Sequence, residues 1–455
     1  MKYQTRTADA DSFRGFRYLH GLSYSNVAML TLFLYLYLLA PYFDLRVMVL
    51  HGGMLATAFL LLRHYRLAFK VLALESVLMV FIVLCLFAIY NLVVVAIYSV
   101  EFTTAFQTYL IQVCIYLMLG LVLAMSLMQR ALDMDQVITL IFKLVTFVVF
   151  VNALIIVIEY RVPAFRAIIE SMLYLPENSN INYLTREYRL RGIASGGAAN
   201  LSLFHGMVLV IIQALYIKHK IGVVYTLVAS VTIFTSLLFI GRTGILIGFI
   251  GIVSFHALNL MMARDKLSLR RLFLYVSLAV IIVLAPPVFS IFFPDNVLAY
   301  SISFLYEGIE GLQEEGTTRA IANMFDIPNK WGKLLFGVGA HWGDFTLQGS
   351  VDAGYMRMLT ALGIPLALAF YCFYAFLAKY LFNLTHYKSV WIVLMIIMFI
   401  AEIKEPFIFK GYSARLIWMM IGMGICYASC SPFRSDQRQD QVQAEEGGRA
   451  SHHET

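Results

Sequence analysis

The chain has 455 residues, of which 61% are hydrophobic and only 13% are charged, and its formal net charge is +7. A soluble domain carries about 25% charged residues, so this composition predicts an integral membrane protein. The basic residues lie between apolar runs rather than in a basic arm, which argues against nucleic-acid binding. The five cysteines form no C-x-x-C pair, so we expect no metal site and no disulfide framework, and no cofactor is predicted.

Runs of about 18 or more apolar residues mark candidate spanning helices. The first run, Ser25 to Phe43, lacks a small-residue cleavage pattern and is interpreted as a helix rather than a signal peptide. The second is interrupted by His51, Gly52 and Gly53. The sequence therefore predicts an all-α polytopic membrane protein with about twelve spans, at 24–43, 45–62, 71–98, 103–128, 136–158, 198–217, 221–240, 243–262, 271–293, 353–378, 389–408 and 413–430.

The positions of Lys and Arg predict how these spans are oriented. With a cytoplasmic N-terminus, most basic residues fall in short inward connections, as the positive-inside rule requires. The inward set is Arg63, Arg66, Lys70, Arg130, Lys218, Lys220, Arg264, Lys266, Arg270, Arg271, Lys379 and Lys388, and the outward set is Arg46, Arg242, Lys404 and Lys410. Both termini are therefore predicted to be cytoplasmic, with an N-terminal segment (1–23), a transmembrane domain (24–430) and a disordered tail (431–455).

This orientation places two long polar segments, about 159–197 and 294–352, on the outer side of the membrane. It also explains the arginine within the apolar stretch "FIGRTGILIG". A charge at the bilayer centre costs roughly 2.5–3.5 kcal/mol, so Arg242 is better placed at a surface. Because Gly241 and Gly244 permit a tight turn, we expect Arg242 at an outer turn between two helices.

The first outer segment ends in "REYRLRGIASGGAAN", where three arginines (Arg186, Arg189 and Arg191) precede glycines and the start of a helix. Two interpretations remain open. The cluster contacts lipid headgroups, or it binds a large anion at the helix start. Helix N-termini favour anions, glycines allow a phosphate to approach the backbone, and arginine contacts phosphate oxygens with two prongs.

The second outer segment contains three residues of interest. Arg319 opens a predicted helix in "TTRAIANMF", and His341 follows in the glycine-rich turn "LLFGVGAHWGDF". Asp352 precedes the next span and is either an N-cap or a catalytic group, while His341 is either a general base or a surface residue.

A charged group, "AEIKEPFIFKGY", lies at the outer end of the span 389–408. It contains Glu402, Lys404, Glu405 and Lys410, with Pro406 between them. These charged residues either pair with one another in a structural role or form the outer wall of the same site as the arginine cluster.

The order of "RLRGIASGGAAN", "FIGRTGILIG", "GTTRAIANMF…LLFGVGAHWGDF" and "VDAGYMRMLTALGI" resembles the bacterial O-antigen polymerase and ligase superfamily, that is, the Wzy-type polymerases and their ligase relatives. The motifs cover about residues 185–365, and the span layout with two large periplasmic loops covers the rest. The resemblance implies a metal-independent glycosyltransferase of the type-C kind in the bacterial inner membrane. Its substrate would be an oligosaccharide carried on undecaprenyl diphosphate, and a chain-length regulator protein would be a partner.

The resemblance also implies roles for individual residues. Arg191, Arg242 and Arg319, with Arg189 in the same cluster, would hold the diphosphate. Arginines are suited to stabilising the negative charge that grows on this leaving group.

An acceptor hydroxyl also needs a base. The sequence offers Asp352, His341 and Glu405 and does not choose among them.

Two other functions, an O-antigen ligase and a transporter, agree less well with the sequence than a polymerase does. Ligases of the superfamily carry a histidine just before the helix that begins "SVDAGYMRM", where this chain has Val351 and Asp352, which favours a polymerase over an O-antigen ligase acting on lipid A core. A flippase or other transporter would place ionisable residues near the membrane midplane and show related halves, and the sequence shows neither feature.

Overall fold

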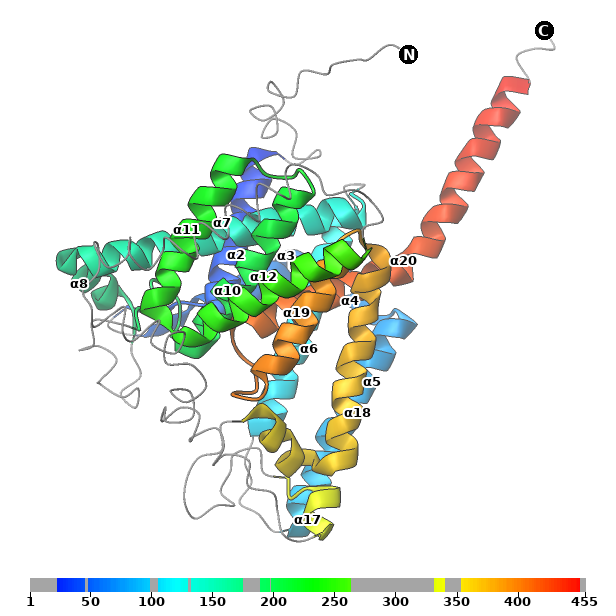
Figure 1. The fold of residues 1–455 in the computed structure, drawn as a ribbon. Helices are drawn as coiled ribbons and strands as arrows, with labels where there is room; N and C mark the ends of the chain where they lie inside the picture. The colour runs from blue at the N-terminus through cyan, green and yellow to red at the C-terminus, as the bar shows by residue number, and fades with distance from the viewer. Residues whose placement is uncertain are drawn as a thin grey trace.

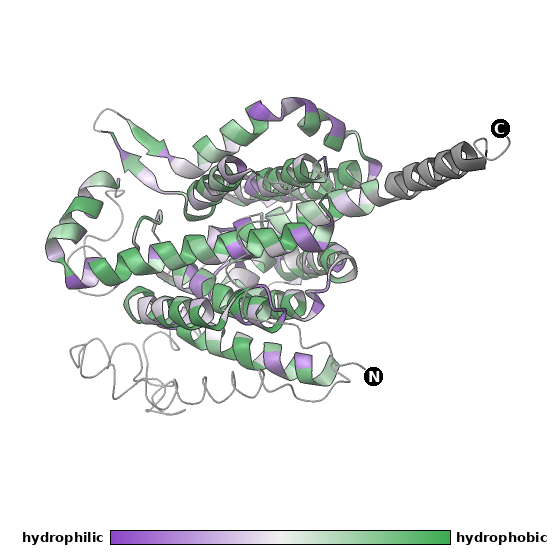
Figure 2. Cartoon of the chain, turned by 90° about the horizontal axis from the view of Figure 1, so that it is seen from above, coloured by the Kyte–Doolittle hydropathy of each residue, from purple (hydrophilic) through white to green (hydrophobic). Residues whose placement is uncertain are grey.

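The chain folds into a bundle of helices (Figure 1). This computed structural model describes residues 23–45, 48–98, 105–129, 132–174, 189–196, 198–262, 331–339 and 353–450. Within these ranges eight helices are long and apolar enough to cross a membrane, so the chain is a multi-pass membrane protein. Figure 2 shows that hydrophobic residues cover most of the length of these helices.

The helices fall into a group of long apolar helices and a group of shorter ones. The long apolar helices are α5 (Glu75–Tyr98), α6 (Ala105–Met128), α7 (Met134–Arg161), α10 (Ala198–Ile217), α11 (Val223–Ile240), α12 (Arg242–Met262), α18 (Gly354–Leu384) and α20 (Gly411–Ala450). The shorter helices are α2 (Tyr24–Leu39), α3 (Gly52–Arg63), α4 (Tyr65–Leu72), α8 (Pro163–Met172), α17 (Trp331–Phe336) and α19 (Lys388–Ala401). Strands β1 (Tyr42–Asp44) and β2 (Val49–His51) pair antiparallel, with Phe43 opposite Leu50.

Five predicted spans, from 103–128 to 243–262, match α6, α7, α10, α11 and α12 within a few residues. The first two predicted spans differ, because α2 ends at Leu39 and a β-hairpin precedes α3. Helix α3 has 12 residues and α19 has 14, which at 1.5 Å per residue is about 18 and 21 Å, short of a hydrocarbon core of about 30 Å. The predicted number of twelve spans is therefore not confirmed, and the span 271–293 lies outside the described residues.

The end of the chain also differs from expectation. The sequence predicts a disordered tail over 431–455, whereas α20 continues as helix to Ala450. The stretch "QRQDQVQAEE" is rich in good helix formers, which accounts for the continuation.

Small residues let pairs of helices approach closely in the core. A Cβ on Gly120 of α6 would lie 1.9 Å from the Met419 carbonyl oxygen of α20, and one on Gly244 of α12 would lie 2.1 Å from the Ser202 carbonyl oxygen of α10. Such small-residue contacts are typical of helix packing in membranes. Gly244 is thus a packing residue rather than the turn-forming residue that the sequence suggested, and it places the starts of α10 and α12 side by side.

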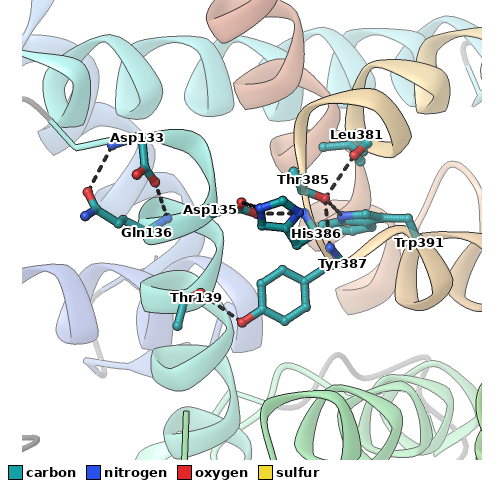
Figure 3. A network of polar contacts seen from close by, with 9 residues as sticks. All are labelled: Asp133, Asp135, Gln136, Thr139, Leu381, Thr385, His386, Tyr387 and Trp391. Atoms are coloured by element: carbon teal, nitrogen blue, oxygen red, sulfur yellow. Dashed lines mark hydrogen bonds and ion pairs between the residues drawn. The ribbon is translucent and has the colours of Figure 1, made fainter. Parts of the chain in front are cut away.

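At the opposite end of the bundle, a polar network joins the start of α7 to the α18–α19 turn (Figure 3). Asp133 and Gln136 form a capping box at the α7 N-terminus. Asp135 accepts from the His386 backbone N–H at 2.8 Å and contacts His386 Nε2 at 3.2 Å. Thr139 and Tyr387 are hydrogen-bonded at 2.8 Å. These contacts fix this end of the bundle.

Helix α18 is broken near its first third. Gly363 has φ 75° and ψ 168°, and Pro365 lies two residues after it. Pro365 has no N–H, so the carbonyl four residues earlier, on Ala361, loses its helical donor. The Thr360 carbonyl instead accepts from the Val338 N–H at 2.8 Å, just after α17. The break therefore creates carbonyl groups that other segments must satisfy.

Asn91 of α5 supplies the missing donor. Its side chain is fully buried and its Nδ2 donates to the Ala361 oxygen at 3.0 Å and to the Gly339 oxygen at 2.9 Å. Gln107 Nε2 donates in turn to Asn91 Oδ1 at 2.6 Å. One amide thus joins α5, α6, the segment after α17 and the break in α18.

We expect Asn91→Leu to destabilise the protein by about 2 kcal/mol, because two buried carbonyls and the Gln107 amide lose their partner. Thermal unfolding of the purified protein in detergent measures this loss. Val93→Leu, at an exposed position of the same helix, is the control and should leave the midpoint unchanged. An unchanged midpoint in Asn91→Leu would contradict the assigned role of this amide.

Candidate functional site

The segment 189–196 forms a structured loop that lies against the end of α11. The backbone N–H groups of Arg189 and Leu190 donate to the Phe239 oxygen at 2.5 and 3.1 Å. This satisfies a carbonyl that the end of α11 leaves without a helical donor. Arg189 has φ 73°, a left-handed conformation that is uncommon for a residue with a side chain. The loop conformation is therefore held by specific contacts rather than by local preference.

Polar residues of α7 hold the middle of this loop. The Gly192 N–H donates to Glu159 Oε2 at 3.2 Å, and the Ile193 N–H donates to Asn152 Oδ1 at 3.1 Å. Gly192 has φ 60°, and a Cβ there would lie 2.4 Å from Asn152 Oδ1. Only glycine therefore fits this position. Asn152 and Glu159 are buried, which explains two polar residues in an otherwise apolar helix.

The Arg191 side chain lies along this loop. Its Nη1 donates to the Ser195 oxygen at 3.4 Å, and its buried Nη2 has no hydrogen-bond partner among the described residues. Burial lowers the pKa of Arg191, while Tyr412 and Glu159 oppose that effect. A guanidinium stays charged throughout the physiological range, so Arg191 keeps a positive charge against this loop.

The C-terminal part of the loop is fixed by Tyr412, the second residue of α20. Its hydroxyl accepts from the Gly196 N–H at 3.0 Å, contacts Ser195 Oγ at 3.2 Å and also donates to the Gly196 oxygen. The Ser195 N–H donates to the Leu39 oxygen at the end of α2 at 3.0 Å. The loop is thereby attached to α2, α7, α11 and α20, immediately before α10 begins.

The loop between α19 and α20, residues 402–410, carries the next charges. Lys404 Nζ donates to Thr243 Oγ1 at 2.9 Å, beside Arg242 at the start of α12. Glu405 pairs with Lys410 at 3.3 Å and accepts from Asn200 Nδ2 at 3.5 Å, near the start of α10. This loop therefore contacts the N-terminal parts of both α10 and α12.

Glu402 anchors the 402–410 loop from inside the protein. Its carboxyl group is fully buried, accepts from the Ile408 N–H at 3.0 Å and contacts the Tyr371 hydroxyl at 3.2 Å. Its backbone oxygen accepts from the Gly354 N–H at 2.9 Å, where a Cβ would lie 2.5 Å from Glu402 Oε1. Burial raises the pKa of Glu402 from its ordinary 4.5 to about 8.

These contacts define one region, which we call the polar end: the 189–196 loop, the starts of α10 and α12, and the 402–410 loop. It contains four of the predicted site residues, Arg189, Arg191, Arg242 and Glu405. Arg242 begins α12, with only Gly241 between it and α11, so the prediction that it lies at a turn between two helices agrees with the structure. Asp352, His341 and Arg319 lie outside the described residues.

The polar end has the chemistry of an anion-binding site. Two helix N-termini lie side by side there, and each directs backbone N–H groups and a positive dipole end outward. Arg191, Arg242 and Lys404 add positive charge, whereas Lys410 is paired with Glu405. In the described part of the chain, no group of three or more His, Cys, Asp or Glu residues is arranged to hold a metal ion.

Sequence reasoning missed the residues that hold this region in place: Asn152, Glu159, Glu402 as a buried anchor, and Tyr412. A polar residue within an apolar span was the available signal for Asn152 and Glu159, because such residues are costly unless they have a partner. No comparable signal marks Tyr412, since tyrosine is common throughout this chain.

The chain matches no protein-family model, no curated protein and no solved structure.

The raised pKa of Glu402 predicts how stability depends on pH. The folded state binds this proton more tightly than the unfolded state, so the stabilisation is complete below about pH 4.5 and is lost as pH rises through about 8. Glu402→Gln stays neutral, so its thermal midpoint should fall less between about pH 6 and about pH 9 than that of the wild type. Midpoints that fall in parallel would contradict this account.

Proposed function

We propose that this chain is a polysaccharide polymerase of the bacterial inner membrane. It transfers a growing glycan from undecaprenyl diphosphate onto a hydroxyl of an incoming lipid-linked repeat unit, at the periplasmic face. The observation that carries the proposal is the polar end itself, where the loop that carries Arg191 precedes α10 and Arg242 begins the neighbouring helix α12. A diphosphate between a lipid and a sugar is the kind of ligand that these cations and N–H groups suit.

The reaction breaks the bond between the sugar C1 and the diphosphate oxygen and forms a bond between C1 and the acceptor oxygen. Undecaprenyl diphosphate leaves with the negative charge, which Arg191 and Arg242 would stabilise. The proton of the acceptor hydroxyl passes to a base. Glu405 is the described candidate, since its carboxylate lies beside Asn200 and Lys410. Asp352 and His341 remain candidates from the sequence.

The orientation follows from the same proposal. The polar end faces the periplasm, and both termini lie in the cytoplasm, as the distribution of Lys and Arg predicts. A lipid-linked substrate would then reach the polar end from the outer leaflet, beside the apolar surfaces of the helices.

Deletion of the gene in the native host, followed by gel separation of surface glycans, tests the class of function. A ladder that collapses to a single repeat unit, still attached to its anchor, identifies a polymerase. If no repeat unit reaches the surface, the proposal fails in favour of a ligase or a flippase.

Complementation with Arg191 variants tests the site. We expect Arg191→Lys and Arg191→Ala to reduce long chains on the order of tenfold or more, because a point charge does not replace a two-pronged donor. Arg166→Lys is the matched control, since Arg166 pairs with Glu170 at 2.7 Å in α8 and lysine keeps that ion pair. Normal accumulation of each variant in the membrane must be verified. Wild-type chain lengths in both Arg191 variants would refute the role of this residue.

A further inference from the structure

A second feature lies at the end of the bundle opposite the polar end. A shallow groove that encloses about 70 Å³ and is otherwise open to its surroundings runs between α2, α3 and α6. Its walls are mostly apolar, including Phe33, Phe59, Leu60 and Leu127, while Arg63 and Ser126 lie at its polar margin. The groove is therefore a hydrophobic site with a basic margin.

Arg63 at this margin, and Arg66 in the first turn of α4 (Tyr65–Leu72), lack acidic partners in the part of the chain that the structure describes. Arg63 Nη1 contacts the Met29 sulfur at 3.6 Å, and its guanidinium lies 5.9 Å from the centre of the Phe59 ring. Arg66 donates to its neighbour, the Tyr65 hydroxyl, at 3.0 Å. A thioether and an aromatic face are weak partners for a guanidinium. Both arginines are exposed, so they remain available to an anion.

Helix α4 follows directly and has the character of a helix at a membrane surface. Leu67 and Val71 face the protein, whereas Phe69 is 72% exposed and lies between the exposed basic residues Arg66 and Lys70. Exposed aromatic and basic residues on one short amphipathic helix are typical of the membrane–water boundary. Because α5 begins three residues later as a spanning helix, this margin of the groove lies at headgroup depth.

We propose that the groove between α2, α3 and α6 binds one anionic phospholipid, with an acyl chain against Phe33, Phe59 and Leu60 and the phosphate against Arg63 and Arg66. The apolar wall suits the chain and the basic margin suits the headgroup, and basic pockets between spanning helices are known to bind acidic lipids. The distribution of Lys and Arg predicts that this site faces the cytoplasmic leaflet. The inference is independent of the proposed function, since it rests on the other end of the protein.

Native mass spectrometry of the full chain in detergent, after removal of lipid, tests this site. Phosphatidylglycerol and phosphatidylcholine with the same acyl chains are added at equal concentrations. The wild type should retain one phosphatidylglycerol with a preference of about tenfold or more over phosphatidylcholine, as expected for two basic residues facing an anionic headgroup. Arg63→Gln combined with Arg66→Gln should reduce this preference to about twofold or less.

Two further variants separate the groove from general surface charge. Lys218→Gln combined with Lys220→Gln removes two exposed basic residues from the α10–α11 connection, and should leave the preference unchanged. Ser126→Phe fills the groove but keeps both arginines, and should weaken phosphatidylglycerol binding. Equal retention of the two lipids by the wild type, or wild-type binding by Ser126→Phe, would overturn the proposal.

Discussion

Wherever a helix breaks inside an apolar bundle, its free backbone N–H and C=O groups must find partners within the protein, because hydrocarbon supplies none. This constraint governs the structure. At the break in α18, Asn91 and the Val338 N–H supply donors to carbonyls that the helix leaves without a partner. At the 189–196 loop, Asn152 and Glu159 accept from backbone N–H groups. Each of these two irregular segments is thus paired with particular polar side chains from a neighbouring helix.

The same pairing positions the charges of the polar end. Tyr412 and Asn152 fix the loop that carries Arg191, and Glu402 fixes the loop that carries Lys404 and Glu405. Close packing at Gly244 sets the starts of α10 and α12 beside each other. Hydrogen bonds from several helices therefore hold the loops that carry these charges. Such preorganisation is what the proposed stabilisation of a leaving group would require.

Hydropathy predicted the membrane class and the helices α6, α7, α10, α11 and α12 closely, because each is a long apolar run. Hydropathy did not predict the β-hairpin at 40–52, which is closed by a hydrogen bond from the Gly52 N–H to the Pro41 oxygen. By hydropathy alone, this apolar stretch resembles part of a span. The turn at Arg242 was predictable from the cost of a buried charge. The partners of the loops were not, because a sequence does not show which helix lies next to which. The pairing of Lys404 with Thr243, 161 positions apart, is an example.

The central claim is that the polar end binds a diphosphate. The most direct measurement is the affinity of the purified protein for a short polyprenyl diphosphate compared with the matching monophosphate, in the wild type and in Arg191→Lys. The account predicts that the wild type prefers the diphosphate and that Arg191→Lys loses most of this preference. Equal affinity for the two ligands, or an unchanged preference in the variant, would contradict it.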